Sequence, residues 1–290
     1  MEKLLFEGVC TALVTPFANG TIDYYMLQKL LEHQIEAEIP AVVLAGTTGE
    51  SPVLSDVEKQ QLFKAAVRMA AGRCKIIAGT GSNNTEHCVR LSQIAEDCGA
   101  DGLLIVSPYY NKTSADGLLQ HYGSVARKTT LPIIVYNVPS RTGMDIPVGC
   151  YKDLSRIESV VGVKEASGSI QKVAQIKAQC SADFNVWTGN DDLIVPVMAL
   201  GGKGVISVIA NALPRETLAI TTAALQGDYL TAASKQLQLL PVIDMLFQEV
   251  NPMPIKHVMS LLGYDCGECR LPLTKPSLTL QEKLKEYFVQ

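Results

Sequence analysis

The sequence predicts an α/β protein, a (β/α)8 TIM barrel with a C-terminal helical appendage. Of its 290 residues, 47% are hydrophobic and 19% are charged, which supplies the apolar side chains for a full core. Eight short apolar runs rich in β-branched residues recur along the chain, and segments with helical spacing of apolar residues separate them. Buried strands that alternate with helices indicate a parallel sheet covered by those helices. Eight such units favour a closed barrel over an open, doubly wound sheet.

The predicted strands are identified by their apolar runs. They begin at Gly8, Ala41, Lys75, Asp101, Pro132, Val160, Phe184 and Gly204. Helical spacing between them is clear from Tyr25 to Ile35 and from Leu62 to Val67. A capping box at Ser55–Glu58 and the proline Pro214 mark two of the helix starts.

The alternation of strands and helices stops near residue 226. Beyond it the sequence predicts helices over Tyr229–Phe247 and Met253–Leu262, and a last helix that begins at the capping box Thr279–Glu282. The predicted division is therefore a catalytic barrel over 1–226 and a helical region over 227–290. Barrel enzymes carry their chemistry in the loops that follow the strands, so the candidate residues are sought there.

Composition and charge exclude several classes of protein. The net charge is −4 with no long basic run, and 6% of residues are aromatic, which disfavours nucleic acid as a partner. No run approaches the length of about eighteen apolar residues that a membrane span needs, and the first residues do not form a secretory signal. The eight cysteines are scattered and too sparse for a disulfide scaffold. These features predict a cytoplasmic protein with reduced thiols and no membrane partner.

Lys164 is the first candidate, because it interrupts the sixth apolar run where an apolar residue would be expected. Strand alternation puts Val160, Gly162 and Lys164 on one face, and the small Gly162 would leave room beside the lysine. Partial burial at the barrel mouth disfavours the ammonium form, which supplies the neutral amine needed to attack a ketone. The alternative is a lysine that reaches solvent or pairs with a carboxylate such as Glu165.

Tyr136 and Arg141 belong to the fifth strand and its loop. Tyr136 ends the strand at the place that corresponds to Lys164, and a phenol there can relay protons between imine intermediates. Arg141 follows five residues later, and its planar fork of donors suits a carboxylate. The competing interpretations are an ordinary core tyrosine and a surface arginine.

The loop after the second strand, Gly46–Ser51, combines glycines and hydroxyl side chains before a helix. Such a loop exposes backbone amides and predicts an anion site, although the spacing of a P-loop is absent. The usual barrel phosphate site, after strands seven and eight, is disfavoured because Asp191 and Asp192 would repel a phosphate. A small carboxylate at Thr47 and Thr48 fits the loop better.

Other chemistry has weaker support. Tyr109 and Tyr110 add two phenols after the fourth strand, where tyrosines are often packing or interface residues. The four histidines lack metal-ligand spacing, and no serine nucleophile motif is present. The pair Cys266 and Cys269 is a lone CxxC, a weak signal for zinc or redox chemistry.

Together these pieces resemble the pyruvate-dependent class I aldolases and lyases, and within them the dihydrodipicolinate synthase branch. The resemblance runs from GVCTALVTPF near the N-terminus to Arg270–Leu273. The matching motifs are GTTGES, IIAGTGSN, SPYYN, YNVPSRTG, GVKEASG, GVISVIAN and NPMPIK. Each is weak by itself, and their number, order and spacing make the match strong.

The resemblance implies a condensation of pyruvate with L-aspartate 4-semialdehyde, in the diaminopimelate route to lysine, without a metal or organic cofactor. It implies that Lys164 forms the Schiff base with pyruvate. Thr47, Tyr136 and Tyr110 resemble the family's proton relay, in which the last tyrosine is lent by a neighbouring subunit. The expected assembly is therefore a homo-oligomer, with a tetramer as the expected form.

Four further residues resemble the substrate-binding positions of the family. Thr48 and its amide would hold the pyruvate carboxylate, and Arg141 would receive the carboxylate of the semialdehyde. Ile206 and Gly189 would line the pocket. The arginine and the two threonines together favour the synthases over sibling lyases that split sugar acids, notably N-acetylneuraminate lyase and 2-keto-3-deoxygluconate aldolase. The sequence also leaves open a phosphate- or metal-using barrel enzyme and a catalytically silent binding protein on the same barrel.

One departure from the family concerns regulation. Lysine-inhibited members use a histidine in the helix after GTTGES and a glutamate after the third strand, and the matching residues here are Lys59 and His87. Ser51, Asn83 and Tyr109 do match the family's lysine site. A cation at Lys59 without the glutamate should repel the ammonium group of lysine. We therefore expect weak or absent feedback by lysine.

Overall fold

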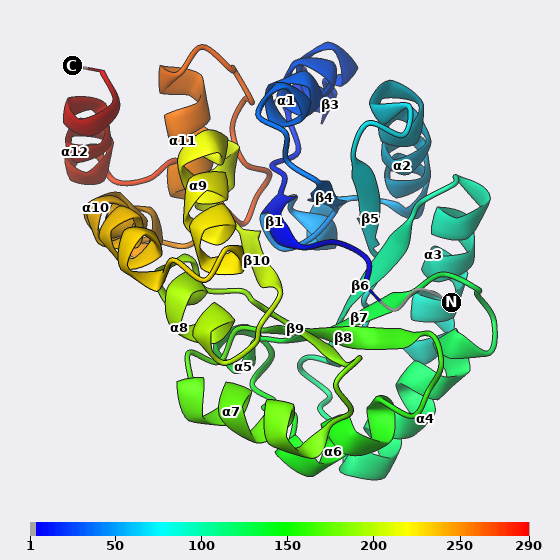
Figure 1. The fold of residues 1–290 in the computed structure, drawn as a ribbon. Coiled ribbons are helices and arrows are strands. Elements are labelled where there is room, and N and C mark those ends of the chain that lie inside the picture. The colour runs from blue at the N-terminus through cyan, green and yellow to red at the C-terminus, as the bar shows by residue number, and fades with distance from the viewer. Residues whose placement is uncertain (1–3, 290) are drawn as a thin grey trace.

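Eight parallel strands close into a barrel in the computed structural model, which describes residues 4–289. Each strand pairs with the next one along the chain, and the last pairs with the first (Figure 1). The barrel strands are β1 (Gly8–Ala12), β4 (Ala41–Leu44), β5 (Lys75–Gly79), β6 (Gly102–Val106), β7 (Ile133–Asn137), β8 (Val160–Glu165), β9 (Asn185–Thr188) and β10 (Gly204–Ser207). The predicted fold class and all eight predicted strands are confirmed.

Helices surround this barrel on the outside (Figure 1). They are α1 (Tyr24–Glu36), α2 (Asp56–Ala70), α3 (Thr85–Asp97), α4 (Ala115–Ala126), α6 (Val148–Leu154), α7 (Ile170–Gln179), α8 (Ile194–Ala199) and α9 (Pro214–Leu225). A short helix α5 (Pro139–Thr142) and three 3-10 turns, η1 (Ser51–Val53), η2 (Asp191–Leu193) and η3 (Ile209–Asn211), lie in loops after strands. A two-stranded hairpin of β2 (Phe17–Ala18) and β3 (Thr21–Ile22) precedes α1.

Local sequence determines where these helices begin. Ser55 and Glu58 form the expected capping box of α2, and Pro214 occupies the first turn of α9. The cap predicted for the last helix is wrong: α12 (Leu278–Phe288) begins at Ser277, whose hydroxyl accepts from the amide of Leu280. Ser277 offers the same capping chemistry two residues earlier, and local pattern alone did not separate the two.

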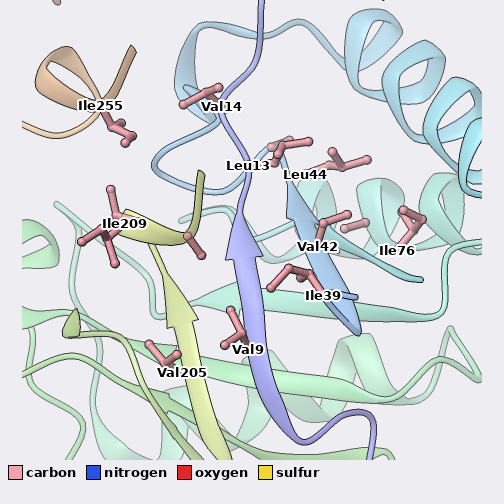
Figure 2. Packing of buried hydrophobic residues seen from close by; sticks show 14 of the residues in the cluster. Val9, Leu13, Val14, Ile39, Val42, Leu44, Ile76, Val205, Ile209 and Ile255 are labelled. Atoms are coloured by element: carbon pink, nitrogen blue, oxygen red, sulfur yellow. The ribbon is translucent and has the colours of Figure 1, made fainter. Parts of the chain in front are cut away.

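The strands are buried on both faces, in two layers of core. Between the strands and the helices, Val9, Val42 and Val205 belong to the larger cluster (Figure 2). Inside the barrel a second cluster includes Ile206 and Trp187, and the Trp187 ring stacks on Phe6 at 4.9 Å between centroids. Burial on both faces explains why the strands are continuous apolar runs and not alternating ones.

The chain after α9 continues as α10 (Tyr229–Phe247), α11 (Met253–Leu261) and α12, and α10 packs on α8 and α9. The last strand–helix unit ends at Leu225, and the division at residue 226 stays a prediction. None of the helices that the structure describes is long and apolar enough to cross a membrane.

Candidate active site

Two adjoining cavities open among the loops at the carboxyl ends of the strands, with volumes of about 170 and 340 Å3. They share the walls formed by Thr47, Tyr136 and Arg141. The smaller cavity also reaches Lys164, and the larger one extends to Lys59. The barrel thus presents one connected cleft at the end where such folds place their chemistry.

Lys164 lies inside the barrel at the end of β8, and its side chain is buried. It is paired in register with Tyr136 on β7, and its Nζ lies 4.5 Å from the centroid of the Tyr136 ring. Within the part of the chain that the structure describes, its amine has no hydrogen bond or ion pair to another side chain. A buried amine without a carboxylate partner is suited to act as a nucleophile.

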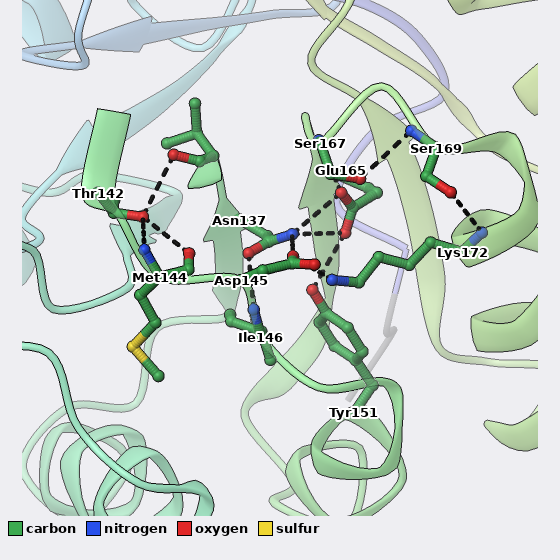
Figure 3. Close-up of polar contacts among 11 residues, drawn as sticks. Asn137, Thr142, Met144, Asp145, Ile146, Tyr151, Glu165, Ser167, Ser169 and Lys172 are labelled. Atoms are coloured by element: carbon green, nitrogen blue, oxygen red, sulfur yellow. Dashed lines mark hydrogen bonds and ion pairs between the residues drawn. The ribbon is translucent and has the colours of Figure 1, made fainter. Parts of the chain in front are cut away.

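The alternative in which Glu165 pairs with Lys164 is wrong. The Glu165 carboxylate points to the other side of the strand, where it accepts from Asn137 Nδ2 at 3.0 Å and from the Tyr151 hydroxyl at 3.1 Å. The amide of Ser167 donates to it as well, at 2.8 Å (Figure 3). Because Asn137 and Glu165 directly follow Tyr136 and Lys164, this network holds together the ends of the two strands that carry the reactive pair.

The expected alternation along β8 fails at one point. Val160 lies in the outer cluster and Val161 inside the barrel, because the pairing of β8 with β7 shifts register near Ile133. A Cβ on Gly162 would lie 2.2 Å from the carbonyl oxygen of Asn185, so this glycine permits close packing of the strands. Gly162 therefore does not serve to make room for the lysine.

Gly189 provides that room. A Cβ at this position, after β9, would lie 2.7 Å from Cε of Lys164 and 2.6 Å from Cβ of Ala166. The amide of Gly189 donates to the carbonyl of Glu165 at 2.8 Å, which holds the two loops together. Only a residue without a side chain leaves the lysine its present path into the cleft.

The Thr47–Thr48 loop and Arg141 are linked by Asn251, a residue absent from the candidates that the sequence suggested. Asn251 Nδ2 donates to Thr48 Oγ1 at 3.0 Å, and Arg141 donates to the Asn251 carbonyl at 3.2 Å. Asn251 lies in the smaller cavity's wall with its Oδ1 unpaired. The motif NPMPIK contains it, so the signal was present without an assigned role.

A buried ion pair also holds the Thr47–Thr48 loop in place. Glu50 Oε1 and Lys256 Nζ lie 2.8 Å apart, with 1% and 3% of their side chains exposed. The second carboxylate oxygen of Glu50 accepts from the amide of Arg270 at 2.8 Å. Helix α11 and the segment after it therefore support the backbone that carries Thr47 and Thr48.

The Asp191 carboxylate accepts hydrogen bonds from the backbone amides that would otherwise be available to a phosphate. Its Oδ2 accepts from the amides of Val208 and Ile209, after β10, at 2.9 and 3.0 Å. Burial raises the pKa of Asp191, and the charge of Lys164 acts against that rise. Because the amides after the last strand already have a carboxylate acceptor, this arrangement leaves the Thr47–Thr48 loop as the better anion site.

Two predicted residues lie apart from the cavities. Ile206 is fully buried within the barrel cluster. Tyr110 is 91% exposed and lines neither cavity of its own chain. Its φ of +67° is unusual for a bulky residue and costs about 1–3 kcal/mol, which the loop must offset elsewhere.

The residues of the expected lysine site lie at the far end of the larger cavity. Ser51, Lys59, His87 and Tyr109 line it, and Asn83 donates to the Tyr109 carbonyl at 3.3 Å. Lys59 is buried, and this burial lowers its pKa.

The two cysteines of the CxxC pair belong to no metal site within the described part of the chain. Burial raises the pKa of both Cys266 and Cys269 to about 12, so neither is a reactive thiolate at neutral pH. Among residues 4–289 no cluster of three or more histidine, cysteine or acidic residues forms a metal site.

Comparison with known proteins shows which protein family this chain resembles over its length. The model of the dihydrodipicolinate synthetase family matches residues 5–290. The chain belongs to this family. A 4-hydroxy-tetrahydrodipicolinate synthase of Thermoanaerobacter sp. (strain X514) is 45% identical over 282 residues, which cover 97% of this chain and 95% of the relative.

Solved structures of the family agree with this assignment. The dihydrodipicolinate synthase of Aquifex aeolicus is 42% identical, with a TM-score of 0.95 over 97% of each chain. The chloride-inhibited dihydrodipicolinate synthase of Acinetobacter baumannii, complexed with pyruvate, is 36% identical, again with a TM-score of 0.95 over 97% of each chain. The family shown by the comparisons is the one that the sequence motifs indicated.

Proposed function

We propose that this member of the dihydrodipicolinate synthetase family is a 4-hydroxy-tetrahydrodipicolinate synthase. It condenses pyruvate with L-aspartate 4-semialdehyde in the diaminopimelate route to lysine. The observation that carries the proposal is the Lys164 amine, which is buried without a carboxylate partner among residues 4–289 and lies 4.5 Å from the centre of the Tyr136 ring. The pyruvate complex of the Acinetobacter relative supports the first substrate.

The reaction begins at Lys164 Nζ. The neutral amine attacks the ketone carbon of pyruvate, water leaves, and a protonated imine forms. The imine draws electrons from the methyl group, which loses a proton and becomes the nucleophilic carbon of an enamine. This carbon attacks the aldehyde of the semialdehyde, and the amino group of the product then displaces Lys164 as the ring closes.

The proton transfers need an acid–base group beside the imine. Tyr136 is the nearest phenol, and Thr47 and Tyr110 complete the proposed relay. Thr48 and its amide hold the pyruvate carboxylate, and Gly189 shapes the pocket, while Ile206 belongs to the barrel core and not to the cavity wall. Arg141, held by the Asn251 carbonyl, receives the carboxylate of the semialdehyde.

Tyr110 is the residue that links the proposed active site to the quaternary structure. A tyrosine that is 91% exposed and has a strained backbone supports a role outside its own chain. We propose that it enters the relay of a neighbouring subunit in a homotetramer. Eight free cysteines support a reducing compartment, the cytoplasm.

Regulation by the end product is a separate part of this proposal. Lys59 and His87 stand where lysine-inhibited members have a histidine and a glutamate, and Lys59 is a buried cation. Its charge disfavours the ammonium group of an entering lysine. We propose that feedback by lysine is weak or absent.

Borohydride reduction in the presence of pyruvate tests the proposal. Mass spectrometry should find a reduced pyruvate adduct on Lys164, and Lys164→Ala should abolish trapping and turnover. An adduct on another lysine would overturn the site assignment. Turnover with N-acetylneuraminate or 2-keto-3-deoxygluconate, but not with the semialdehyde, would identify a sibling lyase, and absence of any adduct would favour a silent binding protein.

A further inference from the structure

Four lysines are buried among the residues that the structure describes: Lys59, Lys164, Lys172 and Lys256. Two of them have a carboxylate partner, since Lys172 pairs with Asp145 and Lys256 with Glu50. The other two have none and both line the connected cleft. The proposed chemistry uses Lys164 and gives no task to the second unpaired cation, Lys59.

Lys59 lies in the first turn of α2 with 5% of its surface exposed. Among residues 4–289 its Nζ forms neither a hydrogen bond nor an ion pair. A buried ammonium with no partner is costly, and proteins normally pair such groups. The lysine faces the larger cavity, so that cavity is where a compensating anion would lie.

The groups around Lys59 offset its charge only in part. Asp56, one turn earlier, is engaged by His87 Nε2 at 2.8 Å and by Arg90 at 3.5 Å. Burial raises the pKa of the nearby Cys88 thiol to about 12, so this thiol is uncharged at neutral pH. Among residues 4–289, Asp56 therefore acts on the charge of Lys59 only through space, without a direct ion pair.

The lining of the larger cavity has one sign of charge. It contains the cations Lys59 and Arg141 and no aspartate or glutamate. Its polar lining also includes Ser51, Ser82 and His87, while aliphatic side chains such as Leu54 form part of the wall. With a volume of about 340 Å3, the space suits an anion that has a short hydrocarbon body.

We propose that the Lys59 end of this cavity binds a small organic carboxylate, with Lys59 as its charge partner. The site is distinct from the carboxylate seats at Thr48 and Arg141, and it does not depend on the proposed synthase activity. At the position where lysine-inhibited members of the family bind lysine, this chain would take an anion, because the cation of Lys59 stands in place of a histidine.

Calorimetric titration with succinate in a chloride-free buffer tests this site. The wild type should bind succinate, and Lys59→Gln should weaken binding at least about tenfold, the loss of one charge-assisted contact. Arg68→Gln, an exposed charge change on the same helix, should bind like the wild type. Arg141→Gln should also retain a binding event, because that residue belongs to the other carboxylate seat.

Several results would overturn the proposal. Equal affinity of the wild type and Lys59→Gln would remove the lysine from the site, and loss of binding in Arg141→Gln alone would place succinate in the substrate seat. Chloride or phosphate that binds as tightly as succinate would contradict a site for organic carboxylates. No binding, together with a change of oligomer mass in Lys59→Gln by light scattering, would show that a second copy pairs the cation.

Thermal melts show whether each variant is folded and whether succinate stabilises it. Succinate should raise the melting temperature of the wild type and of Arg68→Gln, since a ligand of the native state stabilises it. It should leave the melting temperature of folded Lys59→Gln unchanged. An equal shift in all three proteins would contradict the assignment, whatever the outcome of the synthase assay.

Discussion

The ion pair between Glu50 and Lys256 offers a sharp test of how the C-terminal region supports the active site. Lys256→Met removes the cation but keeps an unbranched side chain that is one atom shorter. Glu50, 1% exposed, would then be a buried carboxylate that keeps the amide of Arg270 as a donor but has lost its charged partner. Removing one partner of a buried pair costs about 3–5 kcal/mol.

This cost is large enough to measure in a thermal melt. At about 2 °C per kcal/mol for a chain of this size, the melting temperature should fall by about 6–10 °C. Because Glu50 carries the backbone of Thr47 and Thr48, the KM for pyruvate should rise as well. Differential scanning calorimetry and steady-state kinetics on the same samples measure both effects.

Two further variants test whether the loss of stability comes from breaking the buried ion pair. Lys275→Met breaks the exposed pair with Glu268, where the side chains are 63% and 69% exposed, and should change stability by less than about 1 kcal/mol. Adding Glu50→Gln to Lys256→Met removes the stranded charge and should restore at least half of the lost stability. If Lys256→Met melts within about 2 °C of the wild type, or if the double variant is as unstable as the single one, the pair does not hold the loop.

Three further predictions concern the lysine, the regulator and acid stability. Gly189→Ala should leave the protein folded but reduce borohydride trapping of pyruvate at least about tenfold, because a methyl group would overlap Cε of Lys164; trapping at the wild-type level would contradict this. Sub-millimolar lysine should leave the steady-state rate of the wild type unchanged. A double variant, Lys59→His with His87→Glu, should become inhibited by lysine. Strong inhibition of the wild type would refute the role given to these two residues. Burial lowers the pKa of His121 to about 4, so the unfolded chain binds its proton first as the pH falls below about 6.5. Through this residue stability should therefore decrease by up to about 3 kcal/mol between pH 6.5 and 4. Urea titrations should find a smaller slope in His121→Gln, where His33 and His257, whose pKa values burial also lowers, still contribute.

The sequence by itself determined the barrel and the location of its chemistry. Apolar runs such as the one that begins at Ala41, and helix starts such as the capping box at Ser55, are local patterns, and local sterics and hydrogen bonding decide them. Lys164 and Tyr136 can be identified for the same reason. Each is a polar residue at the end of an apolar run, and such an interruption is visible in the sequence alone.

The tertiary structure decided what surrounds those residues. Asn251 and Thr48 lie 203 residues apart along the chain and are joined by one hydrogen bond, and no local pattern predicts such a contact. The bulge in β8 likewise depends on pairing with β7, so alternation placed Val160 on the wrong face, and the room for Lys164 came from Gly189, after another strand. Periodicity reports which residues are buried; only the closed fold decides which of them meet, because those contacts depend on the relative placement of segments far apart in the sequence.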